Sequence, residues 1–77
     1  MVTGLVLVRL QAGKEKQALA KIKGTPGVSH VSAVYGRWDL VVDIEADDLP
    51  NMTRVVIEKL RAIPGVFATE TLVTTAI

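Results

Sequence analysis

The chain has 77 residues and no cysteine, and its nine basic and eight acidic residues leave a net charge of +1. This length predicts a single domain with a thin stability margin, and the missing cysteines exclude the disulfides and thiolate metal sites that stabilise many small domains. A single histidine argues against a metal centre, and the balanced charge argues against direct binding of nucleic acid. We therefore expect neither metal nor cofactor, and we expect self-association as the route to stability.

The first half of the chain predicts a strand, a helix and a second strand. Residues 5–10 form an apolar run rich in β-branched side chains, which favours a strand. Residues 14–23 place apolar side chains on one helical stripe among lysines, and the glycines and proline of residues 24–27 end that helix. Residues 28–35 then form the second strand. The apolar stripe of the helix consists of Ala18, Leu19 and Ile22.

The second half predicts a strand and a longer helix. Residues 36–39 form a tight hairpin turn, and the side chains of residues 40–45 then alternate with the period of a strand. Asp47 or Asp48 can cap the following helix, and Pro50 fits its first turn, where a missing N–H costs nothing. We expect the buried stripe of this helix to consist of Leu49, Met52, Val56, Leu60 and Ile63.

The two halves also repeat in sequence. Residues 22–28 align with residues 60–66 at an offset of 38, and each segment ends in Pro-Gly-Val. After the second of these turns, residues 66–77 supply a last strand. The resulting order βαββαβ is that of the α+β ferredoxin-like fold, a four-stranded antiparallel sheet with two helices on one face. We therefore predict one such domain over residues 1–77.

The first strand is apolar on both of its faces. Val6, Val8 and Leu10 share one face, and Leu5 and Leu7 share the other. A strand with one face in water should alternate with polar residues, so we expect another subunit to cover the open face of the sheet. A C-terminal extension over that face is the alternative, but the chain has few residues to spare. The prediction is a sheet-mediated homo-oligomer, a dimer or higher.

The turn at residues 36–39 is the first candidate binding site. Gly36 permits a positive backbone torsion, so the turn presents free N–H groups beside the carboxylate of Asp39. The N–H groups can hold a carboxylate and the aspartate can hold an ammonium, which suits a zwitterionic amino acid. An equally good interpretation is that Asp39 only stabilises its own hairpin.

A row of threonines is the second candidate. Thr69, Thr71 and Thr75 share one face of the last strand, and their hydroxyls can donate or accept hydrogen bonds. Threonine is also a good strand former, and on composition alone this structural interpretation is the stronger one.

The sequence contains few features that are typical of a catalytic site. His30 lies beside serines in the second strand, and Asp43 and Glu45 share a face of the third, yet neither arrangement is a convincing acid–base pair. We expect no enzyme; the alternative is a small dimeric ferredoxin-like monooxygenase or isomerase with His30, Trp38 and Tyr35 around an apolar pocket. RNA-recognition domains share the element order, but the central strands carry none of the aromatic residues that stack on bases.

Two segments carry a family resemblance. Residues 34–41, Val-Tyr-Gly-Arg-Trp-Asp-Leu-Val, contain a Gly-x-x-Asp hairpin, and residues 60–73 contain a Pro-Gly-Val turn followed by Thr-x-Thr. In this order they resemble the RAM domain, the effector-binding and oligomerisation domain of Lrp/AsnC transcription regulators, and the resemblance covers essentially the whole chain. It implies that an amino-acid effector binds between dimers. The ligand-binding positions that it implies are Gly36, Arg37, Asp39, Thr69 and Thr71.

The resemblance also implies a role in modulating transcription or amino-acid metabolism. Family regulators carry a helix-turn-helix domain before this one, so we expect a stand-alone module, with a piece trimmed from a longer regulator as the alternative. A full-length Lrp/AsnC regulator is then a candidate partner. No apolar run is long enough for a membrane span and the N-terminus lacks the basic region of a signal peptide, so we expect a cytoplasmic protein.

Overall fold

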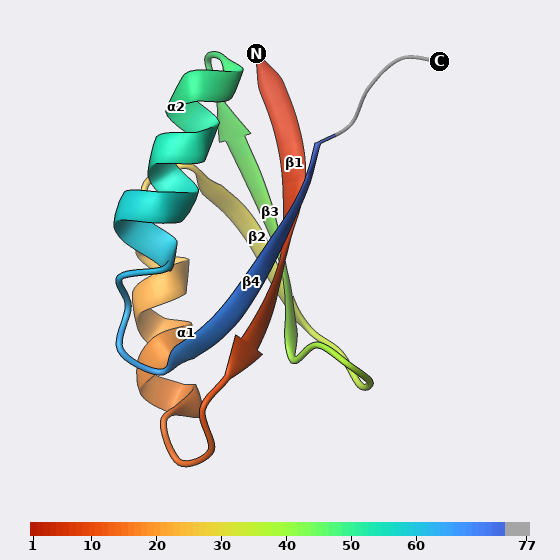
Figure 1. Cartoon of the computed structure of the whole chain (residues 1–77), viewed down its shortest axis with the longest axis vertical. Helices are drawn as coiled ribbons and strands as arrows, with labels where there is room; N and C mark the ends of the chain where they lie inside the picture. Colours follow the sequence, from red (N-terminus) through yellow and green to blue (C-terminus); the bar gives the residue numbers. More distant parts are fainter. Residues whose placement is uncertain (74–77) are drawn as a thin grey trace.

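The computed structural model describes residues 1–73, and its elements follow the order predicted from the sequence. They are β1 (Val2–Leu10), α1 (Glu15–Lys23), β2 (Val28–Ala33), β3 (Leu40–Ala46), α2 (Leu49–Arg54), the π-helical stretch η1 (Val55–Leu60) and β4 (Val66–Val73). The strands form one antiparallel sheet in the order β2-β3-β1-β4. All the helices cover the same face of this sheet (Figure 1). The predicted ferredoxin-like α+β fold is confirmed.

The hydrophobic core lies between the helices and the two central strands. β1 pairs with β3 so that Val6 is opposite Val42 and Val8 is opposite Leu40, and all four side chains are buried. The alternate residues of β1 point to the other face of the sheet, where Leu5 keeps 39% of its surface exposed. The helices complete the core with Ala18, Ile22, Met52, Val56, Leu60 and Ile63. β1 is therefore apolar on both faces, as predicted, and the helices cover only one of them.

The connection between β2 and β3 is longer than the predicted tight turn. β2 ends at Ala33 and not at residue 35, and the bond that closes the hairpin runs from Val34 N to Asp39 O at 3.0 Å. The connection is longer because Asp39 is also bonded to the central strand β1. Its backbone N–H donates to Val8 O at 2.8 Å. Since Asp39 is held by the central strand, the residues between Val34 and Asp39 form an open loop that projects beyond the sheet (Figure 1).

The second helix begins as the sequence predicts. The carboxylate of Asp48 accepts a hydrogen bond from Asn51 N at 2.9 Å, and Pro50 lies in the first turn. The helix continues from α2 into η1, where a bond from Arg61 N to Val56 O at 2.9 Å has the wider spacing of a π-helix.

One residue of the predicted buried stripe was wrongly placed. Leu49 is 52% exposed, whereas the other four members of the stripe belong to the core. Leu49 is the first residue of α2, and it lines a hollow over β4 instead of reaching the central strands. The helical period identifies the correct face of the helix, but it does not show how far the sheet extends beneath that face.

The described residues end within the last strand. β4 is described up to Val73, so the end of the predicted strand 66–77, with Thr75, lies outside the described residues. Within residues 1–73, neither the length nor the apolarity of any helix is sufficient to span a bilayer.

Replacing Leu60 with alanine will lower the free energy of unfolding by about 2–5 kcal/mol, because a fully buried side chain leaves a cavity in the core. Leu49→Ala is the matched control on the same helix, and its exposed position predicts a loss of less than about 1 kcal/mol. Urea unfolding at one protein concentration measures both values. Similar losses in the two variants would contradict the position assigned to Leu49.

Candidate ligand-binding sites at the hairpin and the outer strand

The loop between β2 and β3 presents exposed side chains to solvent. Gly36 has a φ of 129°, a conformation that L side chains rarely adopt, so glycine is required here for the path of the backbone. No atom lies within 4 Å of a Cβ built at this position, so the requirement does not come from crowding. Arg37 is exposed, Trp38 is half-buried, and Tyr35 is fully exposed. The loop therefore carries an exposed cation and an exposed aromatic ring.

Asp39 ties this loop to the end of β1. Besides its two backbone bonds, its carboxylate atom Oδ2 accepts a hydrogen bond from Leu10 N at 2.7 Å. Leu10 is the last residue of β1, so the carboxylate satisfies an N–H group at a strand end and not one within the hairpin itself. No hydrogen bond from residues 1–73 reaches the other oxygen, Oδ1. Asp39 thus has a structural role and keeps one acceptor atom available for a ligand.

Thr69 and Thr71 lie on the helix-facing side of β4. They pair with Val8 and Val6 of β1, whose side chains point into the core. Both threonines line a hollow of about 240 Å³ between β4 and the second helix, and Arg61 reaches the same hollow from the end of η1. The remaining lining residues are Leu49, Met52, Thr53, Val56, Ile57 and Val73. This hollow combines apolar walls with three hydroxyls and one guanidinium.

Arg61 was missed by the sequence analysis. A Pro-Gly turn separates it from the threonines, and only the packing of η1 against β4 brings the two together. A basic residue at the C-terminal end of a helix is common, because it stabilises the helix dipole, so the presence of Arg61 in the sequence did not indicate a binding site.

One chain does not bring the predicted ligand-binding residues into a single site. Leu40, Val8 and Thr69 lie in one row across β3, β1 and β4, so Thr69 is two strand spacings, or roughly 10 Å, from β3, the strand that begins directly after Asp39. The hollow beside Asp39 is lined by residues of β1, α1, β2 and β3 and includes neither threonine. The hairpin and the threonines are two separate candidate half-sites.

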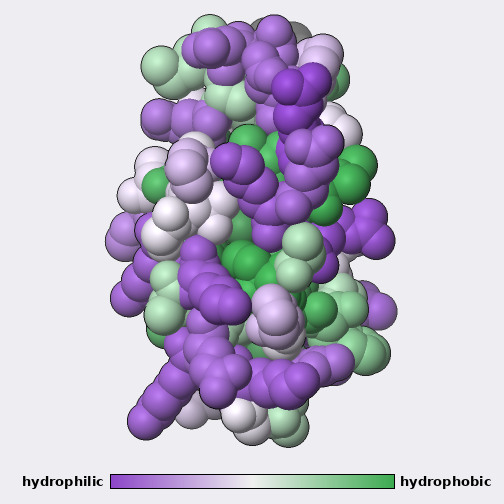
Figure 2. Space-filling model, turned by 90° about the vertical axis from the view of Figure 1, so that its left-hand side faces the viewer, coloured by the Kyte–Doolittle hydropathy of each residue, from purple (hydrophilic) through white to green (hydrophobic). Residues whose placement is uncertain are grey.

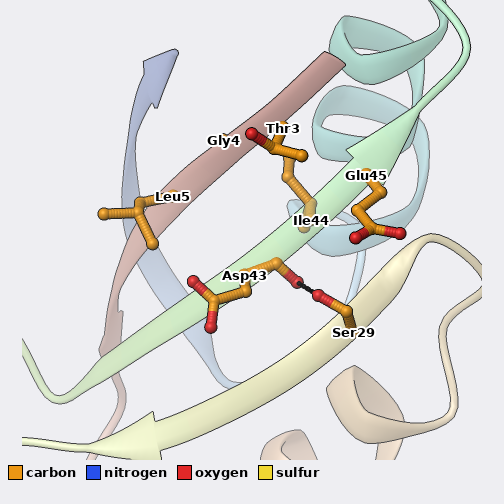
Figure 3. A pocket seen from close by; sticks show the side chains of 7 residues that line it. All are labelled: Thr3, Gly4, Leu5, Ser29, Asp43, Ile44 and Glu45. Atoms are coloured by element: carbon orange, nitrogen blue, oxygen red, sulfur yellow. Dashed lines mark hydrogen bonds between the residues drawn. The ribbon is translucent and has the colours of Figure 1, made fainter. Parts of the chain in front are cut away.

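The open face of the sheet carries a third hollow, of about 390 Å³ (Figure 3). Asp43 and Glu45 project into it from β3, and Thr3 and Leu5 line it from β1. Ser29 closes one side, and its hydroxyl donates to Asp43 O at 3.2 Å. Asp43 is half-buried and Glu45 is exposed, and the two carboxylates lie on the central strand β3 opposite Leu5 and Thr3 of β1.

The residues considered for catalysis do not converge. His30 is exposed on β2 and lines a shallow hollow with Lys23, Val28, Ser29 and Val31, which contains neither Trp38 nor Tyr35. Within residues 1–73, no group of three or more His, Cys, Asp or Glu side chains is placed to hold a metal ion.

Comparison with known proteins gives consistent matches over this domain. A model of the Lrp/AsnC ligand-binding domain matches residues 3–76. An uncharacterized HTH-type transcriptional regulator of Pyrococcus furiosus is 36% identical over 74 residues, covering 92% of this chain and 49% of that protein. The crystal structure of FFRP-DM1 has a TM-score of 0.91 and 35% identity, covering 97% of this chain and 100% of that one.

An enzyme also contains a similar segment. The homocitrate synthase of Sulfurisphaera tokodaii is 32% identical over 71 residues, which are 91% of this chain but only 15% of the enzyme. Against the regulator of P. furiosus, by contrast, the chain spans about half of the relative's length. A segment of this kind therefore occurs in proteins of different overall length.

Replacing Asp39 with alanine will lower the free energy of unfolding by about 1 kcal/mol, because the N–H of Leu10 loses its acceptor. Asp39→Asn keeps an acceptor oxygen and removes only the charge, so we expect a smaller loss. Urea unfolding of the two variants, at equal protein concentration, separates these contributions. Equal losses would mean that the charge, and not the hydrogen bond, supports the end of β1.

Proposed function

The chain belongs to the Lrp/AsnC ligand-binding domain family, and we propose that it binds an amino-acid effector and couples that binding to its own assembly. The observation that carries the proposal is the hydrogen bonding of the Asp39 carboxylate. This carboxylate is fixed by Leu10 N at 2.7 Å, yet its second oxygen is free at an exposed loop. A fixed, half-satisfied carboxylate is suited to accept a hydrogen bond from a ligand ammonium group.

The proposed effector site is completed by a second chain. Within one chain, the hollow beside Asp39 and the hollow with Thr69 and Thr71 are distinct. A zwitterion held between two chains contacts the loop of one copy through Asp39 and the backbone around Gly36. Arg37, the threonine hydroxyls and Arg61 can donate to its carboxylate. The division of the binding residues between two hollows supports this arrangement.

The proposed assembly uses the open face of the sheet. Leu5 and Leu72 pair across β1 and β4, and they are 39% and 48% exposed. Leu7 and Val41 pair across β1 and β3 on the same face and are half-buried. A contiguous apolar strip on the two central strands and one outer strand is the kind of surface that a second copy covers. Polar and charged residues border it, as at the rim of a protein interface.

Effector binding then controls the assembly by linkage. A ligand that contacts two chains has a higher affinity for the associated state, and it shifts the equilibrium toward that state by the difference in binding free energy. In a regulator such as the P. furiosus relative, an assembly of this kind can change how a DNA-binding domain is presented. The similar segment in homocitrate synthase supports a second output, the control of an enzyme. For the first output, the changed presentation of a DNA-binding domain, the proposed partner is a full-length Lrp/AsnC regulator.

An amino acid that binds this chain will raise its thermal stability. At 100 times the dissociation constant the gain is about 2.7 kcal/mol, a shift of several degrees for a domain of this size. A thermal-shift screen of the twenty amino acids finds the ligand, and Asp39→Asn and the double variant Thr69→Val, Thr71→Val should each abolish its shift. Asp47→Asn, which changes an exposed carboxylate at the other end of β3 from the loop, serves as the control.

The outcomes of that screen separate the two parts of the proposal. A ligand whose shift survives in both site variants would place effector binding elsewhere on the molecule. If no amino acid causes a shift in the wild type, effector binding is rejected, and the assembly must be judged from its own measurement.

Introducing a charge on the open face of the sheet will break the proposed dimer. We expect Leu5→Lys to reduce the mass found by sedimentation equilibrium, because the lysine ammonium loses its water if the face is covered. Ile57→Lys introduces the same charge at a similarly exposed position on the helix side, and it should leave this dimer intact. An unchanged mass for Leu5→Lys would remove the open face from the proposal.

A further inference from the structure

The hollow beside Asp39 has an apolar floor on the helix side of the sheet, between α1 and the beginning of β3. None of the side chains that form this floor carries a polar atom, so they offer a ligand no hydrogen bond. Two of them, Leu10 and Leu19, pack against the core and remain half-exposed, so a group that enters the hollow removes apolar surface from water. The floor consists of Leu10, Leu19, Ala33 and Leu40.

The rim of the hollow brings charged groups next to this floor. Lys16 and Glu15 of α1 form one part of it, and Glu15 is already engaged because its Oε1 atom accepts a hydrogen bond from Gly13 N at 2.8 Å. Asp39 forms another part, and its Oδ2 atom accepts from the N–H of the floor residue Leu10 at 2.7 Å. A ligand whose ammonium group binds the second oxygen of Asp39 therefore has the apolar floor beside it.

We propose that the hollow beside Asp39 receives the side chain of the effector and selects an apolar amino acid, of the class of leucine, isoleucine, methionine and phenylalanine. The inference rests on the proposed function, because it takes the ligand's ammonium group to be bound by Asp39. The ammonium group and the side chain of an amino acid are attached to the same carbon atom, so a ligand held at Asp39 can direct its side chain onto Leu10 and Leu19. Its carboxylate then faces away from the floor, toward the threonines and Arg61 of the second chain.

The size of the hollow suits one such side chain. Its volume is about 240 Å³, which is below the roughly 300–1,000 Å³ of pockets that hold drug-sized ligands. Figure 2, a view of the helix side, shows apolar surface exposed among largely hydrophilic side chains. A small apolar group can therefore reach such a surface from solvent without displacing a core residue.

The floor discriminates against polar side chains and against small ones for different reasons. A charged or amide side chain loses its bound water at the floor and gains no hydrogen bond there, which costs free energy. The side chain of alanine avoids this cost but leaves most of the floor exposed. A single methylene group changes the affinity for an apolar pocket by about 10- to 200-fold, and leucine has a longer, branched side chain. We therefore expect leucine to bind at least about 10-fold more tightly than alanine.

Isothermal titration calorimetry of the chain with a panel of amino acids tests this selection. Leucine, isoleucine, methionine and phenylalanine represent the apolar class, and alanine, asparagine, lysine and glutamate are the comparison ligands. The tightest member of the apolar class should bind at least about 10-fold more tightly than every comparison ligand. A comparison ligand that binds as tightly as the best apolar one would overturn the inference.

A matched pair of variants locates the selection. Ala33→Leu fills the hollow from an exposed position, so it should weaken the binding of the best apolar ligand at least about 10-fold. Ala20→Leu adds the same group at an exposed position of α1 that does not line the hollow, so it should bind that ligand like the wild type. Circular dichroism checks that both variants fold. Equal affinities of the two variants would contradict the assignment of the side chain to this hollow.

The failure of this inference differs from the failure of the proposed function. If a polar amino acid binds most tightly and Asp39→Asn abolishes its binding, the effector site stands and only the apolar selection is overturned. If the wild type binds no amino acid, the effector site and the selection are rejected together.

Discussion

The structure depends on β1, a central strand with apolar side chains on both faces. On one side Val6 and Val8 anchor the sheet to the helices, and on the other Leu5 and Leu7 face outward. A domain of this size buries a limited share of its surface, and the helices of the described residues cover only one face of the sheet (Figure 1). The same strand therefore fixes the fold of one chain and supplies the apolar face of the self-association that we propose.

β1 also organises the loop that carries the candidate site. Its last residues hold Asp39 through the bonds from Leu10 N to the carboxylate and from Asp39 N to Val8 O. The position of the free carboxylate oxygen thus depends on the same strand that forms the core. A change in how β1 is packed, including its cover by another subunit, can be transmitted to the loop through these two hydrogen bonds. This gives a physical route between assembly and ligand binding.

The candidate binding groups outside the core lie at opposite ends of the sheet. Threonine hydroxyls and Arg61 lie over the outer strand β4, whereas Asp39 and the hollow beside it lie at the opposite end of the sheet order. Among the described residues that line the threonine hollow, none carries a carboxylate that could bind an ammonium group. Complementary half-sites on one chain are satisfied when copies meet, which is how a small domain gains a composite site.

The sequence by itself determined the order of the elements, the faces of the strands and the presence of a cap at Asp47 or Asp48, because hydrophobic period and capping chemistry are local properties of the chain. It also identified Asp39 and the threonines as residues whose side chains are able to bind a ligand. Only the tertiary structure decided that Leu49 is exposed, that Asp39 bonds to Leu10, and that Arg61 joins the threonines while the loop stays apart from them. These facts depend on which segments, distant in sequence, pack side by side. A local sequence pattern carries no information about that packing.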